Sequence, residues 1–340
     1  MLKRIIGLTL ALALATGLYF LINQDAPADR PEVLAAAHDG FTTLLQGDEF
    51  STIAATQGAI YAGGMQGLFK IDPLTLAAVE IKNGERSFQS VRALYADQND
   101  LWVGHDDGLS IIRDGQVIRT IGKEDGLVDP RVIDLLRVDN TTIYAATFSG
   151  LAIIREGSIT FLANSDDLPG ETIKVMLKDS VGFIWLGAYD ARGGGVVIQK
   201  GDVKQAFDIE TGLVHNCVTS IAETPDHQVL VGGGLLTEGG ASLFNYDGQQ
   251  WQIVRTIQKE NGLAGEKVRH IFVDRSNRIW FCSEYDGVAI FRDTGDSLIL
   301  TTADGLSDNE VKKIVQAENG DYWLATRDGV TRVQAAAIFG

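Results

Sequence analysis

The chain has 340 residues, of which 29 are basic and 45 acidic, giving a formal net charge of −16. Without Lys3 and Arg4, which precede an apolar segment, 27 basic and 45 acidic residues leave a net charge of −18. A surface of that sign repels phosphate backbones and anionic lipid, so nucleic-acid binding and attachment to membranes through a basic face are excluded.

The first 28 residues predict an export signal. Residues 5–22 form an uncharged run of 18 residues, which is long for a cleaved signal peptide and reaches the length that spans a bilayer. Ala26-Pro27-Ala28 offers the small residues that a signal peptidase reads, so a retained anchor helix and a cleaved signal peptide both stay open. In either case the positive flank stays inside, so the rest of the chain is expected in the periplasm. Residues 29–40 would be a short linker.

One pattern of about 42 residues recurs seven times between Phe50 and Val333. The same position of each copy holds a large aromatic or apolar residue: Tyr61, Trp102, Tyr144, Trp185, Leu230, Trp280 and Trp323. Around it, short alternating apolar runs end in Gly and Asp turns, which is typical of strands joined by hairpins. Four strands in a unit of this length are typical of a propeller blade. Residues 41–340 are therefore predicted to form one all-β, seven-bladed β-propeller, with the four tryptophans buried between blades.

The strands of a blade are lettered a to d, outward from the axis. In the second copy they are predicted at residues 91–97, 101–105, 108–112 and 116–121. The last copy offers three strands and no fourth, at residues 311–317, 321–326 and 329–333. Residues 41–48 stand before the first copy as residues 298–305 stand before the last. An N-terminal strand is therefore predicted to close the seventh blade and leave no unpaired edge there.

The full repeat reads Gly-Leu, Val-x-x-Ile, an Asp turn, Trp-Val/Leu-Gly and then Asp-Gly-Leu/Val, and its fullest copies are residues 173–197 and 305–333. This string resembles the two-component regulator propeller repeat, over nearly all of the chain after the linker. The resemblance implies a ligand- or partner-binding propeller, since relatives often form extracytoplasmic sensor halves of hybrid histidine kinases that recognise carbohydrate fragments. This chain departs from that plan, because it has one propeller, an apolar segment in front, and no kinase or receiver region.

Signatures of catalysis and metal binding are poor. There is no Gly-x-Ser-x-Gly, His-Glu-x-x-His, Cys-x-x-Cys or phosphate loop. The histidines stand at no ligand spacing and are expected to be surface or hydrogen-bonded residues: His38, His105, His215, His227 and His270. We therefore expect no catalytic residue, no metal site and no cofactor. Cys217 and Cys282 are expected toward the same face of adjacent blades, where a disulfide and two buried thiols both stay open.

The d-to-a and b-to-c loops are expected to open on one face around the channel mouth, where a rigid scaffold presents binding residues. Two b-to-c loops are enlarged, at residues 189–193 and 234–239, and the first brings Asp190 and Arg192 to that face. Tolerated surface drift is the alternative explanation. Tyr285 and Phe148, on b-to-c turns of blades six and three, are candidate stacking faces for a sugar ring.

A cationic collar is the feature that points to a ligand chemistry. In four blades the residue after the first apolar position of strand a is cationic: Arg92, Lys174, Arg269 and Lys312. Side chains near the start of the innermost strand should approach the channel mouth and favour a carboxylate or sulfate group. The alternative is that they pair with neighbouring acids such as Asp97 or Asp134.

These patterns together predict a periplasmic, non-catalytic propeller that binds a ligand, such as an acidic saccharide, or an envelope protein partner. It would be held in the cytoplasmic membrane by the N-terminal helix if that helix is not cleaved. One alternative is a polysaccharide lyase or hydrolase that uses the channel mouth, and another is a scaffold for envelope assembly. A His or Tyr beside a carboxylate pair in the collar, with a perturbed pKa, would favour the enzyme.

Overall fold

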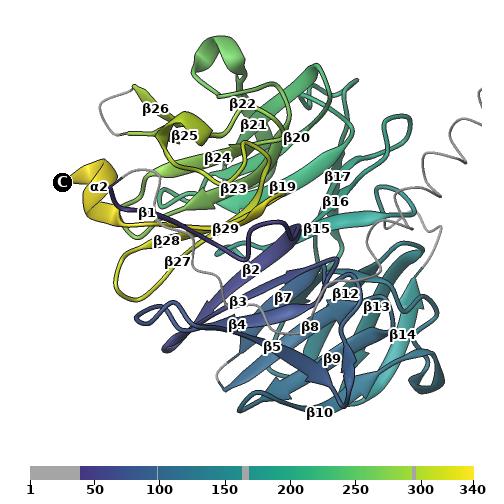
Figure 1. Ribbon diagram of the computed structural model, residues 1–340. Helices are drawn as coiled ribbons and strands as arrows, with labels where there is room; N and C mark the ends of the chain where they lie inside the picture. The colour runs from purple at the N-terminus through teal and green to yellow at the C-terminus, as the bar shows by residue number, and fades with distance from the viewer. Residues whose placement is uncertain (1–38, 98, 163–167, 293–295) are drawn as a thin grey trace, which may run out of the picture. The chain divides into compact units, whose positions relative to one another are not determined.

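The computed structural model describes residues 39–97, 99–162, 168–292 and 296–340, which form seven antiparallel sheets (Figure 1). The predicted seven-bladed propeller is therefore confirmed. The predicted N-terminal helix and most of the linker lie outside the described residues. Within the described ranges, no helix has both the length and the apolarity needed to cross a membrane.

The blades follow one another along the chain. Blade one holds β2 (Phe50–Thr56), β3 (Ala59–Gly64), β4 (Leu68–Ile71), β5 (Ala78–Asn83) and the short β6 (Arg86–Ser87). Blade two holds β7 (Ala93–Asp97), β8 (Asp100–His105), β9 (Gly108–Arg113) and β10 (Gln116–Ile121). Blade three holds β11 (Val132–Arg137), β12 (Thr142–Thr147), β13 (Gly150–Arg155) and β14 (Ser158–Leu162).

Blade four holds β15 (Ile173–Lys178), β16 (Ile184–Ala188), β17 (Gly195–Lys200) and β18 (Val203–Phe207). Blade five holds β19 (Val218–Glu223), β20 (Val229–Leu235), β21 (Glu238–Tyr246) and β22 (Trp251–Ile257). Blade six holds β23 (Val268–Val273), β24 (Ile279–Ser283), β25 (Val288–Phe291) and β26 (Ser297–Leu300). Blade seven holds β27 (Val311–Gln316), β28 (Tyr322–Thr326), β29 (Gly329–Val333) and, from the other end of the chain, β1 (Phe41–Leu44).

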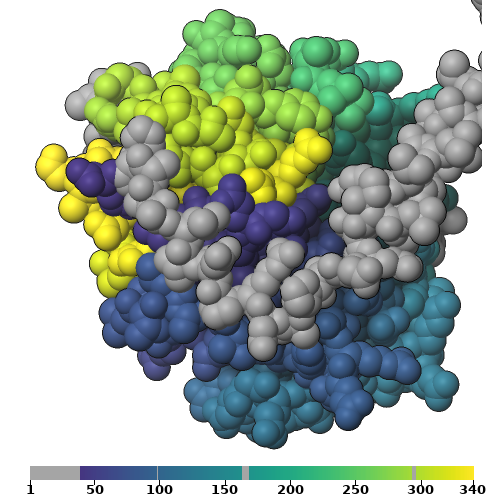
Figure 2. Space-filling view, in the orientation of Figure 1, coloured from purple at the N-terminus to yellow at the C-terminus, as the bar shows by residue number. Residues whose placement is uncertain are grey.

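The ring is closed by the N-terminal strand, as predicted. β1 pairs antiparallel with β29, from Phe41 opposite Val333 to Leu44 opposite Val330. Each innermost strand contacts the next one around the ring, and β27 of the last blade contacts β2 of the first. Figure 2 shows the purple surface of the first strands against the yellow surface of the last blade. The seven innermost strands therefore surround the axis of the ring.

The Gly-Leu string of the repeat lies within the d-to-a loops. Three of these loops contain a 3₁₀ helix: η1 (Lys123–Asp125), η2 (Lys259–Asn261) and η3 (Thr302–Asp304). Each is followed by a left-handed glycine and a buried leucine. A side chain at Gly305, where φ is +113°, would place its Cβ 2.9 Å from Cβ of Phe41 in the closing strand. The glycine is needed there for both the turn and the close approach of β1.

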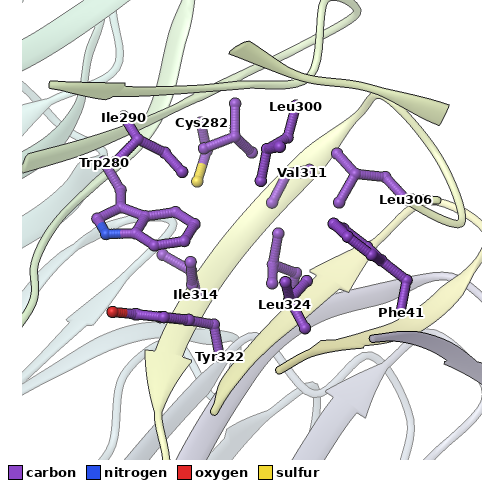
Figure 3. Packing of buried hydrophobic residues seen from close by; sticks show 12 residues of the cluster. Phe41, Trp280, Cys282, Ile290, Leu300, Leu306, Val311, Ile314, Tyr322 and Leu324 are labelled. Atoms are coloured by element: carbon purple, nitrogen blue, oxygen red, sulfur yellow. The ribbon is translucent and has the colours of Figure 1, made fainter. Parts of the chain in front are cut away.

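Buried apolar side chains form the core between adjacent blades, because alternate residues of a strand face opposite neighbours. Figure 3 shows the cluster between blades six and seven, where Trp280 and Ile290 meet Ile314 and Tyr322, and Phe41 of β1 completes it. The closing strand therefore contributes apolar packing to blade seven as well as backbone hydrogen bonds.

Three of the four tryptophans are fully buried as predicted, each with an exposure of 0%: Trp185, Trp280 and Trp323. The prediction is wrong for Trp102, which is half-buried. The surroundings of the two side chains differ. Trp185 meets the large ring of Trp251, with 4.8 Å between ring centroids. Trp102 packs against a cluster of aliphatic side chains from blades two and three that includes Ala145.

The last residues form a short helix, α2 (Ala335–Phe339), after the last strand of blade seven. Phe339 anchors it against blades six and seven. Its ring centroid lies 6.0 Å from that of Trp280 and 6.1 Å from that of Tyr322, and the Arg278 guanidinium lies 3.3 Å above it.

Candidate binding site at the channel mouth

Three of the four collar cations lie at an irregularity near the start of an innermost strand, whereas Arg92 directly precedes β7, whose pairing with β8 is regular. In β15, Ile173 and Val175 pair with the successive residues Ala188 and Gly187, which leaves Lys174 as the extra residue of a β-bulge. The same register shift occurs at Arg269 in β23 and at Lys312 in β27. A bulge leaves its extra residue out of the ladder and can turn its side chain away from the sheet. The repeated bulge therefore presents these side chains at the start of the strands that line the channel.

Three of the four collar cations contact carboxylates. The contacts are Arg92 with Asp106 (2.5 Å), Arg269 with Glu310 (2.8 Å) and Glu284 (3.6 Å), and Lys312 with Glu310 (3.5 Å) and Glu49. The predicted alternative of acid pairing thus holds for three positions, but the predicted partners are wrong. Asp97 pairs with Arg137 instead. Asp134 accepts a 2.7 Å hydrogen bond from the Met176 amide of the next blade.

The acid partners occupy two places in the repeat. Asp106 and Glu284 follow strand b of the cation's own blade, and Glu310 and Glu49 precede strand a of the next blade. In blade four both places hold neutral residues, Tyr189 and Cys217, which form an isolated bridge with each other. The residues at these two places can be read across the repeats, but the sequence does not show that they contact the collar cations, so the sequence analysis missed this rule.

Lys174 is consequently the collar cation without an ion pair among the described residues. Lys174 is an exposed residue, so its amine is open to solvent at the mouth. Desolvation by the strands around the channel is still the main cause that lowers the pKa of Lys174 to about 8, and the positive charge of Arg269 is the next. Arg92 and Lys313 lower the pKa further, whereas Asp134 opposes them. A bound anion would therefore favour the charged form of Lys174, which these three cations disfavour.

A second polar layer lies one residue further along the inner strands. Burial raises the pKa of Asp134 and lowers the pKa of Lys313, and the attraction between these two groups opposes both shifts. Burial, with Lys313 nearby, lowers the pKa of His270 to about 3, so this imidazole is neutral. Lys313, missed by the sequence analysis because it follows a collar residue directly, thus adds a cation to the channel.

Blades six, seven and one carry a continuous chain of ion pairs, which we call the ion-pair belt: Lys267, Glu284, Arg269, Glu310, Lys312 and Glu49. Lys267 is 6% exposed and also contacts Tyr189, with Nζ 3.1 Å from the phenol oxygen. Charges of alternating sign satisfy one another along the belt. The three cations and three carboxylates of the belt therefore balance in charge.

The other predicted ligand residues differ from Lys174 in the contacts that they make. The Asp190 carboxylate accepts a 2.9 Å hydrogen bond from the Arg192 amide, which fixes the turn rather than leaving the acid for a ligand. The Arg192 side chain is exposed. Tyr285 is 50% exposed on the turn after Glu284. The enlarged loop of blade five is a longer hairpin, in which Leu235 still pairs with Glu238.

The features that would favour an enzyme are weak. Glu284 and Glu310 both contact Arg269 and so form a carboxylate pair in the collar. Burial alone would raise the pKa of Glu284, but the hydrogen bond from Lys267 and the charge of Arg269 outweigh it and lower the pKa. A carboxylate held ionised in this way is a poor general acid. Cys217 and Cys282 are buried free thiols, so the disulfide alternative is wrong.

No protein-family model matches the chain, and no curated protein matches its sequence. Solved structures match its fold. The extracellular domain of the putative hybrid two-component system BT3049 from B. thetaiotaomicron aligns with a TM-score of 0.67 and 18% identity, over 84% of this chain and 40% of that one. PorZ, a surface component of the type-IX secretion system of Porphyromonas gingivalis, aligns with a TM-score of 0.62 and 17% identity, over 93% and 50%. Streptogramin B lyase aligns with a TM-score of 0.63 and 11% identity, over 86% and 94%.

This chain spans 40% of the length of the BT3049 domain and half of PorZ. The likeness to an extracellular two-component domain agrees with the resemblance seen in the repeat. At these identities the comparisons show the fold, and the three proteins use that fold for different purposes. Function must therefore be argued from the site.

Proposed function

We propose that this protein is an extracytoplasmic, non-catalytic propeller that binds an anionic ligand at the channel mouth, with Lys174 as the anchoring cation. The observation that carries the proposal is that Lys174 is exposed and has no ion pair among the described residues, while Arg269, Arg92 and Lys313 disfavour the charge of its amine. A cation that is partly removed from water and lacks a counter-ion gains from binding an anion.

Two observations support a location outside the cytoplasm. Residues 1–28 read as an export signal, and two similar structures are described as an extracellular domain and a bacterial surface component. A reporter enzyme fused after Gly340 should be active outside the cytoplasm. N-terminal sequencing of the mature protein then separates a cleaved signal, which would leave Asp29 first, from a retained anchor. Reporter activity confined to the cytoplasm would rule out this location.

Lys174→Gln is the sharpest test of the anchoring cation. Calorimetric titration should compare trigalacturonate, a Glu-rich peptide and a neutral trisaccharide as probes. We expect wild-type protein to bind an acidic probe in preference to the neutral one, and Lys174→Gln to lose at least about tenfold in that affinity, as for one charged hydrogen bond. Lys178→Gln, at the other end of β15, is the matched control and should bind like wild type.

A second variant adds the missing acid without removing the amine. Tyr189 occupies the place that Asp106 and Glu284 hold in other blades and also contacts Lys267, so Tyr189→Glu should add negative charge beside Lys174 and Lys267 and weaken binding of the acidic probes. The arginines are less suitable targets. Removing Arg269 would leave the partly buried Glu284 and Glu310 with fewer partners and so perturb folding. If Lys174→Gln and wild type bind every acidic probe equally, Lys174 is not the anchor.

A further inference from the structure

We infer that the ligand carries a ring beside its acidic group, and that the ring lies against Phe148 at a cavity between blades two and three. This inference rests on the proposed function, because it places the acidic group at Lys174. The charge of the collar indicates an acidic ligand but does not define its shape. A ring beside the acidic group would define part of that shape.

An open cavity of about 440 Å³ lies on the mouth face between these blades. Its lining combines charged, apolar and hydroxyl side chains: Asp106, Lys123, Val128, Asp129, Pro130, Arg131 and Ser149. The volume falls within the range of small-molecule sites, at roughly 300–1,000 Å³. A site of this composition can hold the body of a small ligand while polar groups fix its orientation.

Phe148 adjoins this cavity through its chain neighbour Ser149 and through Arg131. Its side chain is 38% exposed. The guanidinium carbons of Arg92 and Arg131 lie 5.3 and 4.8 Å from its ring centroid, which holds the ring in place by cation–π contacts. Each guanidinium is paired with a carboxylate, Asp106 or Asp129, so the exposed part of the Phe148 ring offers a flat apolar surface for a ring of the ligand.

The Phe148 turn is tied to the strand that carries Lys174. The Thr172 hydroxyl, two residues before Lys174, donates a 3.0 Å hydrogen bond to the Phe148 carbonyl. The inner strands β11 and β15 of these two blades are in contact. Phe148, which we call the ring seat, and Lys174 therefore lie on segments that contact each other. One ligand can place its ring on Phe148 and its acidic group at Lys174.

The carboxylates of the cavity are held in place for hydrogen bonding. Asp129 accepts from Arg131 Nε and Nη2 at 3.0 and 2.7 Å, and from Ser149 Oγ at 2.7 Å. The Arg131 hydrogen bond is the main cause that lowers the pKa of Asp129 to about 2. The Asp106 side chain, 36% exposed, pairs with Arg92 through one oxygen and keeps surface for a hydroxyl or N–H donor. The ligand class is therefore an acid whose ring carries hydrogen-bond donors.

Three acids serve as probes: trigalacturonate with sugar rings, 4-hydroxybenzoate with an aromatic ring, and tricarballylate with no ring. Wild-type protein should bind at least one ring acid about tenfold more tightly than tricarballylate, and Phe148→Ala should abolish that preference while keeping tricarballylate affinity. Tyr285→Ala is the matched control, because Tyr285 is an exposed aromatic residue on the corresponding turn of blade six, beside the ion-pair belt. It should behave like wild type.

The outcomes separate the two proposals. If wild type binds the three acids equally, or if Phe148→Ala weakens all of them to the same extent, the ring seat is overturned while the Lys174 anchor stands. If Phe148→Ala acts as expected but Lys174→Gln changes nothing, the anchor fails. Which ring acid binds more tightly tells a sugar ring from an aromatic one. Phe148→Leu, which keeps an apolar side chain, should retain part of the preference and guards against misfolding.

Discussion

At the residue scale, the buried His105 is matched to specific hydrogen-bond partners. His105 is 2% exposed, and its Nε2 lies 2.8 Å from Ser110 Oγ. The Asp107 amide donates to Nδ1 at 3.2 Å. That nitrogen must therefore accept a hydrogen bond, which requires the neutral imidazole. Burial, against the charges of Asp107 and Asp106, lowers the pKa of His105 to about 4.

His105 should make the fold sensitive to acid. Its folded-state pKa lies below the unfolded value of about 6.5, so the unfolded chain binds the proton first and stability falls as pH drops from 6.5 toward 4. The loss is on the order of 3 kcal/mol at most. We expect His105→Gln to lose less thermal stability than wild type between pH 7 and 4.5, in melting curves. The exposed His227→Gln is the control, and equal acid sensitivity in all three proteins would contradict the assignment.

The tryptophans should differ in the stability that they contribute. Trp185 is fully buried and donates a 2.7 Å hydrogen bond to Asp179, so Trp185→Ala should destabilise the fold by about 3–5 kcal/mol. Trp102 is half-buried, so Trp102→Ala should cost clearly less. Urea unfolding monitored by circular dichroism measures both. Equal losses of stability in the two variants would show that the exposure of the tryptophan does not determine how much it contributes to stability.

At the element scale, the closing strand is the part of the fold that depends on both chain ends. Truncation before Asp48 should remove β1 and expose the edge of β29, so the product should aggregate or melt at a lower temperature. A circular permutant that joins Gly340 to Asp39 through a flexible linker restores the strand and should melt close to wild type. A truncated protein with an unchanged melting temperature would show that the closing strand is dispensable.

Hydrogen bonds between side chains join blades six and seven. The Tyr322 hydroxyl donates to Asp274 at 2.8 Å and accepts from Arg278 at 2.7 Å. Tyr322→Phe keeps the ring contact with Trp280 but removes both bonds, so it should destabilise by about 2 kcal/mol in urea unfolding. Tyr246→Phe is a matched control, because its ring packs on Trp251 at the same 36° tilt. A similar loss in both variants would assign the effect to packing.

At the scale of the whole molecule, ligand binding should take up protons. Lys174 has a pKa of about 8, and a bound anion would raise it. Affinity for trigalacturonate should therefore be flat below pH 8 and fall as pH rises above it, because the free protein then loses the proton that the complex keeps. Calorimetry at pH 8.5 in buffers of different ionisation enthalpy measures this uptake. Lys174→Gln should abolish it, and affinity that is constant from pH 7 to 9.5 in wild type would contradict the mechanism.

The number of blades, the closing strand and the face that carries the collar were predictable from the sequence. These features depend on chain order and on the alternation of apolar residues, which repeat every blade and so reinforce one another. The seventh blade shows this, because its missing strand had a matching segment upstream in Phe41 to Leu44. The shared position of the four collar cations was equally readable, because each follows the first apolar residue of strand a, and three of them are the extra residue of a bulge.

Tertiary structure alone decided which of those cations lacks a partner. Glu310 reaches Arg269 from the next blade, and Glu49 reaches Lys312 from the other end of the chain. Ion pairs across blades depend on side-chain reach over a few ångströms between residues far apart in sequence, and a periodic pattern carries no such distance. The same holds for Trp102, whose exposure depends on which residues of blades two and three surround it. Lys174 stands out because the two nearby places for an acid hold Tyr189 and Cys217, which only the folded ring brings beside it.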